Sequence, residues 1–131
     1  MNKLVTALTE GIKVSVQTEY QAEYSRPDRS HYVFTYKILI ENNSEYTVQL
    51  LRRHWYIYDS CGMRKEVEGE GVVGQQPIIL PSESHHYYSG CHLKSDIGKM
   101  QGFYVMERLI DGKLFEVQIP AFLMMPQFRL S

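Results

Sequence analysis

The sequence has little of what marks secreted, membrane-spanning or disulfide-rich proteins. Its two cysteines, Cys61 and Cys91, are too few for a disulfide scaffold. Residues 1–6 include one lysine and no long apolar core, so we expect no signal peptide. No apolar run approaches the roughly 18 residues that a membrane-spanning helix requires. We therefore expect a cytoplasmic protein with reduced thiols and no membrane partner.

An excess of charge of one sign is also lacking. The chain has 14 basic and 15 acidic residues, and its net charge is −1. This balance provides no broad positive field for nucleic acid, so we expect no nucleic-acid partner. The length of 131 residues suits one domain that folds without metal or disulfide. We predict a single domain over residues 1–123 and a short, loosely packed C-terminal tail over residues 124–131.

Tyrosine, phenylalanine and β-branched residues are plentiful, and they favour strands. Apolar and polar residues alternate along several segments, which is typical of half-buried strands. We predict strands or short extended pieces over residues 12–17, 32–41, 47–59, 63–67, 78–80, 84–91, 100–108 and 114–117. Seven or eight antiparallel strands of this kind indicate an all-β fold, a sandwich of immunoglobulin or fibronectin type III kind. A barrel is the alternative arrangement.

Three local features refine this prediction. The apolar positions change parity near Leu50 and Leu51, which indicates a β-bulge. Asp111 and Gly112 stand between two strand-like runs, which predicts a type I′ hairpin turn. Trp55 lies on a long central strand, where a tryptophan in a sandwich belongs to the core.

Several longer motifs are specific enough to indicate a family. They are Arg53-His54-Trp55, the stretch 66–77, Tyr88-Ser89-Gly90-Cys91, the stretch 98–102 and Ile119-Pro120-Ala121-Phe122. In this order they resemble the ApaG family, over about residues 5–123. One departure is minor: Gln75-Gln76 stands where the family more often has an acidic residue before Gln-Pro.

The resemblance implies a fibronectin type III-like sandwich and a bacterial stand-alone protein. It also implies a gene that often neighbours that of a diadenosine tetraphosphate hydrolase, and a link to cobalt and magnesium tolerance. The same domain occurs fused in eukaryotic F-box proteins and in a polymerase-delta-interacting protein, where it looks like a protein-recognition module. The family carries no established catalytic residue set, so the resemblance assigns none.

Residues 69–74 fit the pattern G-x-G-x-x-G of dinucleotide-binding loops. That site needs a helix directly after the loop, and Pro77 with the β-branched residues behind it excludes one. Two interpretations remain. The loop is either a turn that needs left-handed glycines, or an anion-binding nest of backbone amides. Arg52, Arg53 and Arg64 on the flanking strands are available to complete a nest, whereas Glu66, Glu68 and Glu70 oppose a phosphate.

Catalytic and metal-binding patterns are weak. The five histidines have no zinc-ligand spacing, so we expect no metal site and no cofactor. Cys91 and His54 would make a nucleophile and base only if the fold brought them together. The tyrosines 56, 58, 87, 88 and 104 either form a recognition surface or line the sheets.

We therefore expect a non-catalytic binding module that contacts an unidentified protein partner. The alternative is a small-ligand binder that holds phosphate or pyrophosphate at the glycine loop, with a link to diadenosine tetraphosphate or divalent metals. A nucleotide hydrolase is the third hypothesis. The candidate binding residues are Gly69, Gly71, Val72, Val73, Gly74, Arg53, Arg64 and Tyr88.

Overall fold

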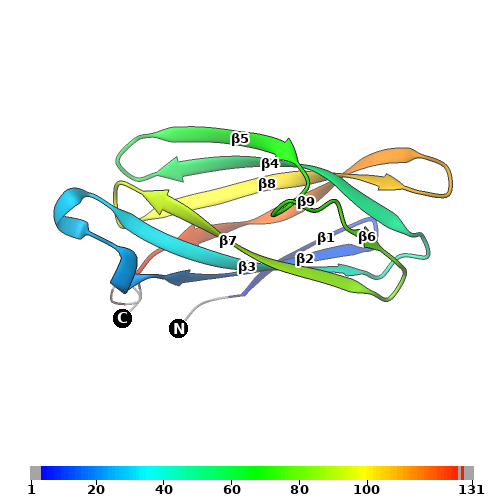
Figure 1. Cartoon of the computed structure of the whole chain (residues 1–131), viewed down its shortest axis with the longest axis horizontal. Helices are drawn as coiled ribbons and strands as arrows, with labels where there is room; N and C mark the ends of the chain where they lie inside the picture. The colour runs from blue at the N-terminus through cyan, green and yellow to red at the C-terminus, as the bar shows by residue number, and fades with distance from the viewer. Residues whose placement is uncertain (1–3, 127, 129–131) are drawn as a thin grey trace.

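The computed structural model describes residues 4–126 and 128, and these form two packed antiparallel sheets (Figure 1). The predicted β-sandwich is confirmed, and the strands number nine rather than seven or eight. They are β1 (Val5–Thr9), β2 (Ile12–Tyr20), β3 (Tyr32–Asn42), β4 (Val48–Asp59), β5 (Arg64–Glu70), β6 (Ile78–Ile79), β7 (Ser84–Leu93), β8 (Gly98–Arg108) and β9 (Lys113–Met124). Two short 3-10 turns, η1 (Ala22–Tyr24) and η2 (Pro27–Arg29), lie between β2 and β3. No helix among the described residues is long and apolar enough to cross a membrane.

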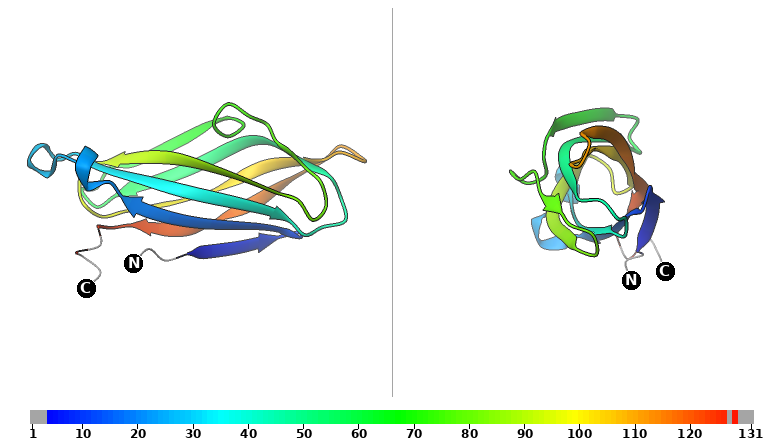
Figure 2. Two further views of the ribbon diagram at one scale, coloured as in Figure 1. Left: turned by 60° about the horizontal axis from the view of Figure 1, so that its bottom comes forward. Right: turned by 90° about the vertical axis from the view of Figure 1, so that its right-hand side faces the viewer.

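The first sheet has the strand order β1-β2-β3-β7, and the second has the order β5-β4-β8-β9, with the short β6 also paired to β4. All strand pairs are antiparallel. The chain crosses between the sheets after β3, β6 and β7. As a result, β5 and β7 are the terminal strands of their sheets on the same side of the sandwich (Figure 2).

The alternation seen in the sequence places the core. Every second residue from Ile12 to Val16 on β2 and from Phe34 to Asn42 on β3 is buried, including Val14 and Ile38. Trp55 is 3% exposed, as predicted for a core residue. The register between β4 and β8 shifts between Leu50 and Arg52, so the predicted bulge at Leu50 and Leu51 is confirmed.

The turn between β8 and β9 differs from the prediction. The hairpin is present, but four residues, Leu109 to Gly112, connect its strands. Gly112 has a φ of 71°, whereas Asp111 keeps a negative φ, so this is not a type I′ turn. The reason is that the Asp111 carboxylate accepts hydrogen bonds from the Arg108 side chain and from the Lys113 backbone N–H. These bonds stabilise a wider loop.

The C-terminal end is better packed than expected. Strand β9 runs through Met124, whose side chain is completely buried, and Pro126 is buried as well. The first residues of the predicted tail therefore belong to the sandwich. Residues 127 and 129–131 of that tail lie outside the described residues.

The two sides of the sandwich are unequal. On one side β9 lies against β1 and β2, where the Gln118 N–H donates to Thr9 Oγ1 at 3.1 Å and Thr18 Oγ1 donates to the Leu123 carbonyl at 3.5 Å. On the other side, no described strand pairs with the outer edge of β5 or of β7. The sandwich is thus closed at β1 and β9 and open at β5 and β7 (Figure 2, right).

Candidate functional site

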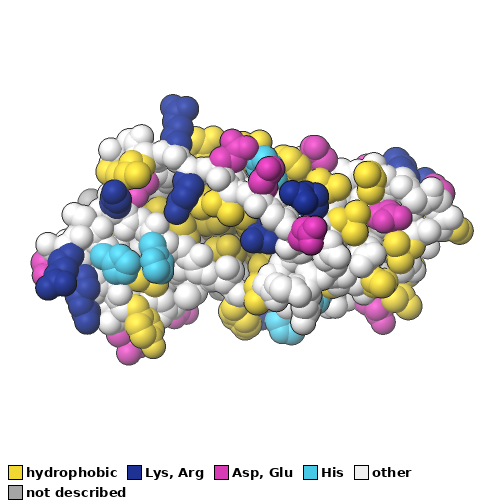
Figure 3. All heavy atoms as spheres, turned by 45° about the horizontal axis from the view of Figure 1, so that its top comes forward, with side chains coloured by type: hydrophobic (Ala, Val, Ile, Leu, Met, Phe, Trp, Pro, Cys, Tyr) yellow, Lys and Arg dark blue, Asp and Glu magenta, His cyan; other side chains and the backbone are white. Residues whose placement is uncertain are grey.

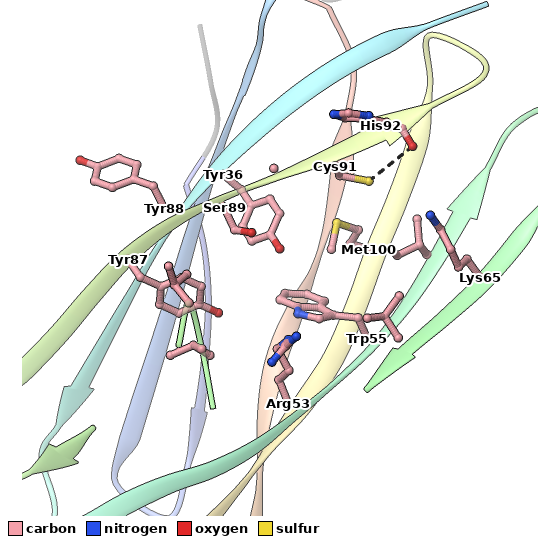
Figure 4. Close-up of a pocket in the computed structure, with 15 residues that line it drawn as sticks. Tyr36, Arg53, Trp55, Lys65, Tyr87, Tyr88, Ser89, Cys91, His92 and Met100 are labelled. Carbon is pink, nitrogen blue, oxygen red and sulfur yellow. Dashed lines mark hydrogen bonds between the residues drawn. The ribbon is translucent and has the colours of Figure 1, made fainter. Parts of the chain in front are cut away.

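A hollow of about 560 Å³ lies at the open side, between the edges of β5 and β7. Its floor is aromatic and apolar, with Tyr36, Trp55, Tyr87 and Met100 among the lining residues (Figure 4). We call this hollow the edge groove. Figure 3 shows its hydrophobic floor with both basic and acidic side chains around it. The groove exists because the two sheets end here without a strand to cover the space between them.

The alternation of β5 decides which charges reach the groove. Lys65 and Val67 line it, whereas Glu66 and Glu68 point to the outer face of the second sheet. There the two carboxylates contact His54, with Glu66 Oε2 2.7 Å from Nε2 and Glu68 Oε2 3.0 Å from Nδ1. The sequence set Glu66, Glu68 and Glu70 against a phosphate at the glycine loop. For the groove, Glu66 and Glu68 are not opposed to an anion, because successive strand residues face opposite ways.

Two cations face the groove. The half-buried Arg53 donates from Nη1 to the carbonyl oxygens of Glu70 and Gly71, both at 2.9 Å. Lys65 lies on the exposed rim. Among the described residues, neither side chain has a carboxylate within 4.0 Å. Arg53 and Lys65 are therefore cations of the groove that form no ion pair with a described carboxylate.

Hydroxyl groups line the same space. Burial raises the pKa of Tyr36, while a hydrogen bond with Ser89 and the charge of Arg53 act in the opposite direction. Burial also raises the pKa of Tyr87, whose hydroxyl lies 2.5 Å from that of the fully buried Tyr104. These phenols stay protonated at neutral pH, so they are available to the groove as hydrogen-bond donors.

The nucleophile and base considered from the sequence are not brought together. Cys91 faces the interior at the groove, and burial raises the pKa of its thiol to about 11. His54 lies on the outer face of β4, bound to Glu66 and Glu68. The thiol therefore stays protonated at neutral pH, and His54 is not placed to act as its base.

The glycine loop has its own turn. Val72 N–H donates to the Gln75 carbonyl at 2.8 Å, and Gln75 N–H donates back at 3.0 Å. The two central residues, Val73 and Gly74, have φ values of 47° and 76°, the signature of a type I′ turn. A Cβ on Gly71, at φ 63°, would lie 2.2 Å from the Gln75 carbonyl oxygen. Gly71 and Gly74 therefore serve backbone shape, which favours the first of the two interpretations.

Few donors of this loop face outwards. The N–H of Gly71 donates to the Leu51 carbonyl at 2.8 Å, and those of Val72 and Gln75 are used in the turn. Arg53 contacts loop carbonyls and not an amide cradle. Arg64 pairs with Tyr58 at the far end of β5, with its guanidinium 5.9 Å from the ring centroid. Of the arginines expected at a nest, Arg53 bonds to loop carbonyls and Arg52 stands opposite Glu70, whereas Arg64 lies away from the loop.

The other predicted site residues lie in different parts of the structure. Val72 lines the groove but is 1% exposed and belongs to the core, so its side chain offers a partner little surface. Val73 is 64% exposed at the rim of the groove. Tyr88 points to the outer face of the first sheet, where the Lys37 ammonium lies 5.7 Å from its ring centroid (Figure 4). Gly69 lies under the Arg53 guanidinium.

Among the lining residues that the sequence did not indicate for a site are Tyr36 and Lys65, whereas Tyr87 belongs to the tyrosines considered for a recognition surface. The parity of residues 64–70 carried the signal for Lys65, because Glu66 and Glu68 occupy the opposite face. The tyrosines gave no such signal, since their position at the groove depends on how the two sheets stack.

The fold and the groove together define a single antiparallel β-sandwich with one closed side and one open side. The sequence profile of the ApaG domain matches residues 22–108. Proteins named ApaG from Sinorhizobium fredii and Brucella anthropi are 47% and 49% identical to this chain over 116 residues, and each match covers 88% of both chains. The chain belongs to the ApaG family.

Solved structures agree with this assignment. A crystal structure of a Bordetella pertussis protein named ApaA superposes with a TM-score of 0.85 at 42% identity, covering 88% of this chain and 93% of that one. A second X-ray structure, determined as a structural genomics target, has a TM-score of 0.87 at 37% identity and covers 95% and 94%. The sandwich described here is therefore shared with experimentally determined structures.

Proposed function

We propose that the protein is a non-catalytic binding module that recognises a protein partner in the edge groove. The observation that carries this proposal is that two unpaired strand edges border a hollow with an aromatic floor. An open edge presents unpaired backbone N–H and C=O groups, and protein-recognition domains use such edges to bind an extended chain. Aromatic side chains beneath it provide the apolar area that stabilises a bound segment.

The two edges differ in how well they are protected. Strand β5 carries five charged residues, Arg64, Lys65, Glu66, Glu68 and Glu70. Charges of this kind discourage edge-to-edge association. Strand β7 has ten residues, Ser84–Leu93, and none of them is lysine, arginine, aspartate or glutamate. Strand β7 is therefore the edge suited to accept a partner chain.

Val73 supports a role for the groove rim. It is a β-branched residue held at a φ of 47°, and its side chain is largely exposed. A non-glycine residue in the left-handed region costs of order 1–3 kcal/mol, and such strain concentrates at functional positions. An exposed apolar side chain in a strained turn adds little to the stability of the fold. A role in partner binding therefore accounts for Val73 better than a role in folding.

The small-ligand alternative is favoured by one observation, the two cations of the groove. A phosphate would meet Arg53 or Lys65 there, whereas the glycine loop already uses the N–H groups of Gly71, Val72 and Gln75. If a small anion is bound, its site is therefore the groove and not the loop. The protonated Cys91 thiol supports a binding role over a nucleophilic one.

The proposal is tested by affinity capture from lysate with matched variants. Val73→Asp places a charge at the rim of the groove, and Ile110→Asp places the same charge on the exposed loop between β8 and β9. We expect wild type and Ile110→Asp to capture the same proteins and Val73→Asp to lose them. Hydrogen exchange on a captured complex should slow at β7. Equal capture by all three proteins would contradict the proposal.

A further inference from the structure

We infer that the occupant of the edge groove is an extended acidic segment of a partner protein, which adds as a strand to β7 and directs acidic side chains toward the cations Arg53 and Lys65. This inference rests on the proposed function and names the chemistry of the partner.

The first support is the geometry of the β7 edge. Strand β7 pairs with β3 over ten residues, from Tyr32 opposite Leu93 to Glu41 opposite Ser84. Its inward residues Tyr87, Ser89 and Cys91 lie at the groove. A strand added to the free edge would continue the same alternation, so every second side chain of the partner would lie over the groove. Side chains of a partner strand paired with β7 would therefore point into the groove.

The second support is the Arg53 guanidinium. An arginine carries five N–H donors, and the two bonds from Nη1 to the carbonyls of Glu70 and Gly71 leave Nη2 and Nε available. The guanidinium lies across Gly69, with Nη2 3.1 Å from where a Cβ would stand. The carbonyl bonds therefore hold the cation in position before a partner arrives. A fixed, planar guanidinium suits a carboxylate.

The third support is the hydroxyl of Tyr87. Tyr104 is completely enclosed, and its hydroxyl lies 2.5 Å from that of Tyr87. If Tyr87 donated to Tyr104, the Tyr104 proton would have no acceptor among the described residues. Tyr104 therefore donates to Tyr87, which leaves the Tyr87 proton for a ligand in the groove. An oxygen acceptor fits this donor as it fits Arg53.

Charge and length together select an acidic chain. The groove faces a partner with Arg53 and Lys65, while Glu66 and Glu68 of the same wall face away to His54. A lysine on the partner would meet a like charge at Arg53 or at Lys65, and a glutamate would meet an opposite one. A free phosphate would satisfy the cations but would leave the ten-residue edge of β7 unpaired. An extended peptide satisfies both.

The test uses a blocked synthetic peptide, acetyl-Thr-Val-Thr-Glu-Thr-Val-Thr-amide, whose alternation presents Val, Glu and Val on one face. We expect it to shift the backbone amide resonances of β7 selectively in nitrogen-15 NMR titrations. Replacing its Glu by Lys should abolish binding. Methylating alternate backbone nitrogens on its pairing edge should also abolish binding, because strand addition needs those N–H donors.

Protein variants make the test specific to the groove. Lys65→Met should lower the affinity for the Glu peptide by roughly fivefold to tenfold, in line with loss of one close charge pair. Lys113→Met, which removes an exposed lysine of β9, should leave the affinity unchanged. Arg53→Lys keeps the charge but loses the planar set of donors. It should therefore weaken binding of the Glu peptide more than binding of the same peptide with Gln in place of Glu.

Several outcomes would overturn the inference. These are no binding of the Glu peptide, equal affinity for the Glu and Lys peptides, or unchanged binding after N-methylation. Inorganic phosphate that competes fully and shifts the same resonances would assign the cations to a free anion instead. If capture still depends on Val73 while the peptides show no charge preference, the proposed function survives and only the acidic partner fails.

Discussion

The guanidinium of Arg53 lies across the backbone of Gly69, its cross-strand neighbour on β5. A Cβ at residue 69 would stand 3.1 Å from Nη2 and 3.2 Å from Nη1. Glycine at this position lets the arginine reach the carbonyls of Glu70 and Gly71, where it joins β4 to the start of the loop. The same contact holds a cation at the groove, so one side chain connects the stability of the loop with the charge of the site.

The two left-handed glycines of the loop should tolerate alanine differently. Gly71→Ala should lower the free energy of unfolding by about 3 kcal/mol or more, because strain at positive φ is combined with a backbone clash at Gln75. Gly74→Ala has nothing within 4 Å of the new Cβ and should cost only about 1–2 kcal/mol. Urea melts of both variants measure the difference. Equal losses would show that the Gln75 carbonyl moves aside freely.

Val73→Asn should stabilise the protein while weakening partner capture. Asparagine tolerates the left-handed region far better than a β-branched residue, so relief of strain should raise the free energy of unfolding by about 1 kcal/mol. Val67→Asn, on β5 with an ordinary φ, is the control and should lose stability. A loss of stability in Val73→Asn would mean that the exposed valine contributes to packing, which would remove it from the binding argument.

Trp55→Ala should destabilise the sandwich by about 3–5 kcal/mol. The ring is buried between the sheets, with centroids 5.6 Å from Tyr36 and 5.9 Å from Phe122. Trp55→Phe keeps part of this contact and should cost less. The measurement is the midpoint of denaturant unfolding, and a change below about 1 kcal/mol would contradict the core position of the ring.

Iodoacetamide should label the two cysteines of the folded protein to different extents. The exposed Cys61 should be alkylated readily at pH 8, whereas Cys91 should stay unmodified in the folded protein, because burial raises its pKa to about 11 and the thiolate is the reactive form. Mass spectrometry of peptides quantifies both sites. Unfolding in urea is the control that exposes Cys91, and rapid labelling of Cys91 in the native protein would refute the assignment.

The raised pKa of Cys91 also predicts that the folded protein loses stability at alkaline pH. An ordinary thiol ionises near pH 8.5, and the folded protein holds the Cys91 proton up to about pH 11. Between these values the native state binds more protons than the unfolded state, so stability falls as pH rises. Burial raises the pKa values of Tyr36 and Tyr87 in the same direction, which adds to the fall above about pH 10. Cys91→Ser should flatten the part of the stability curve below pH 10.

Much of the fold was predictable because its signals are local. Alternation of apolar residues marks strands such as β3, and the parity change at Leu50 marks a bulge that the register of β4 and β8 confirms. The burial of Trp55 followed from its position on a long strand. Strand β1 was missed since its side chains are only half-buried, and the turn after β8 was misread because the Asp111 carboxylate binds Arg108.

The groove was not predictable in this way, because it depends on contacts between segments far apart in the chain. Alternation tells which residues of a strand share a face, but not which face meets the core or which strand is left without a neighbour. Only the order of strands in the two sheets makes β5 and β7 the open edges, turns Glu66 and Glu68 away from the groove and places Val72 in the core. Strand pairing and sheet stacking depend on contacts between distant segments, because the stable arrangement buries the most apolar area while every inner backbone group is hydrogen-bonded. No short stretch of sequence contains this information.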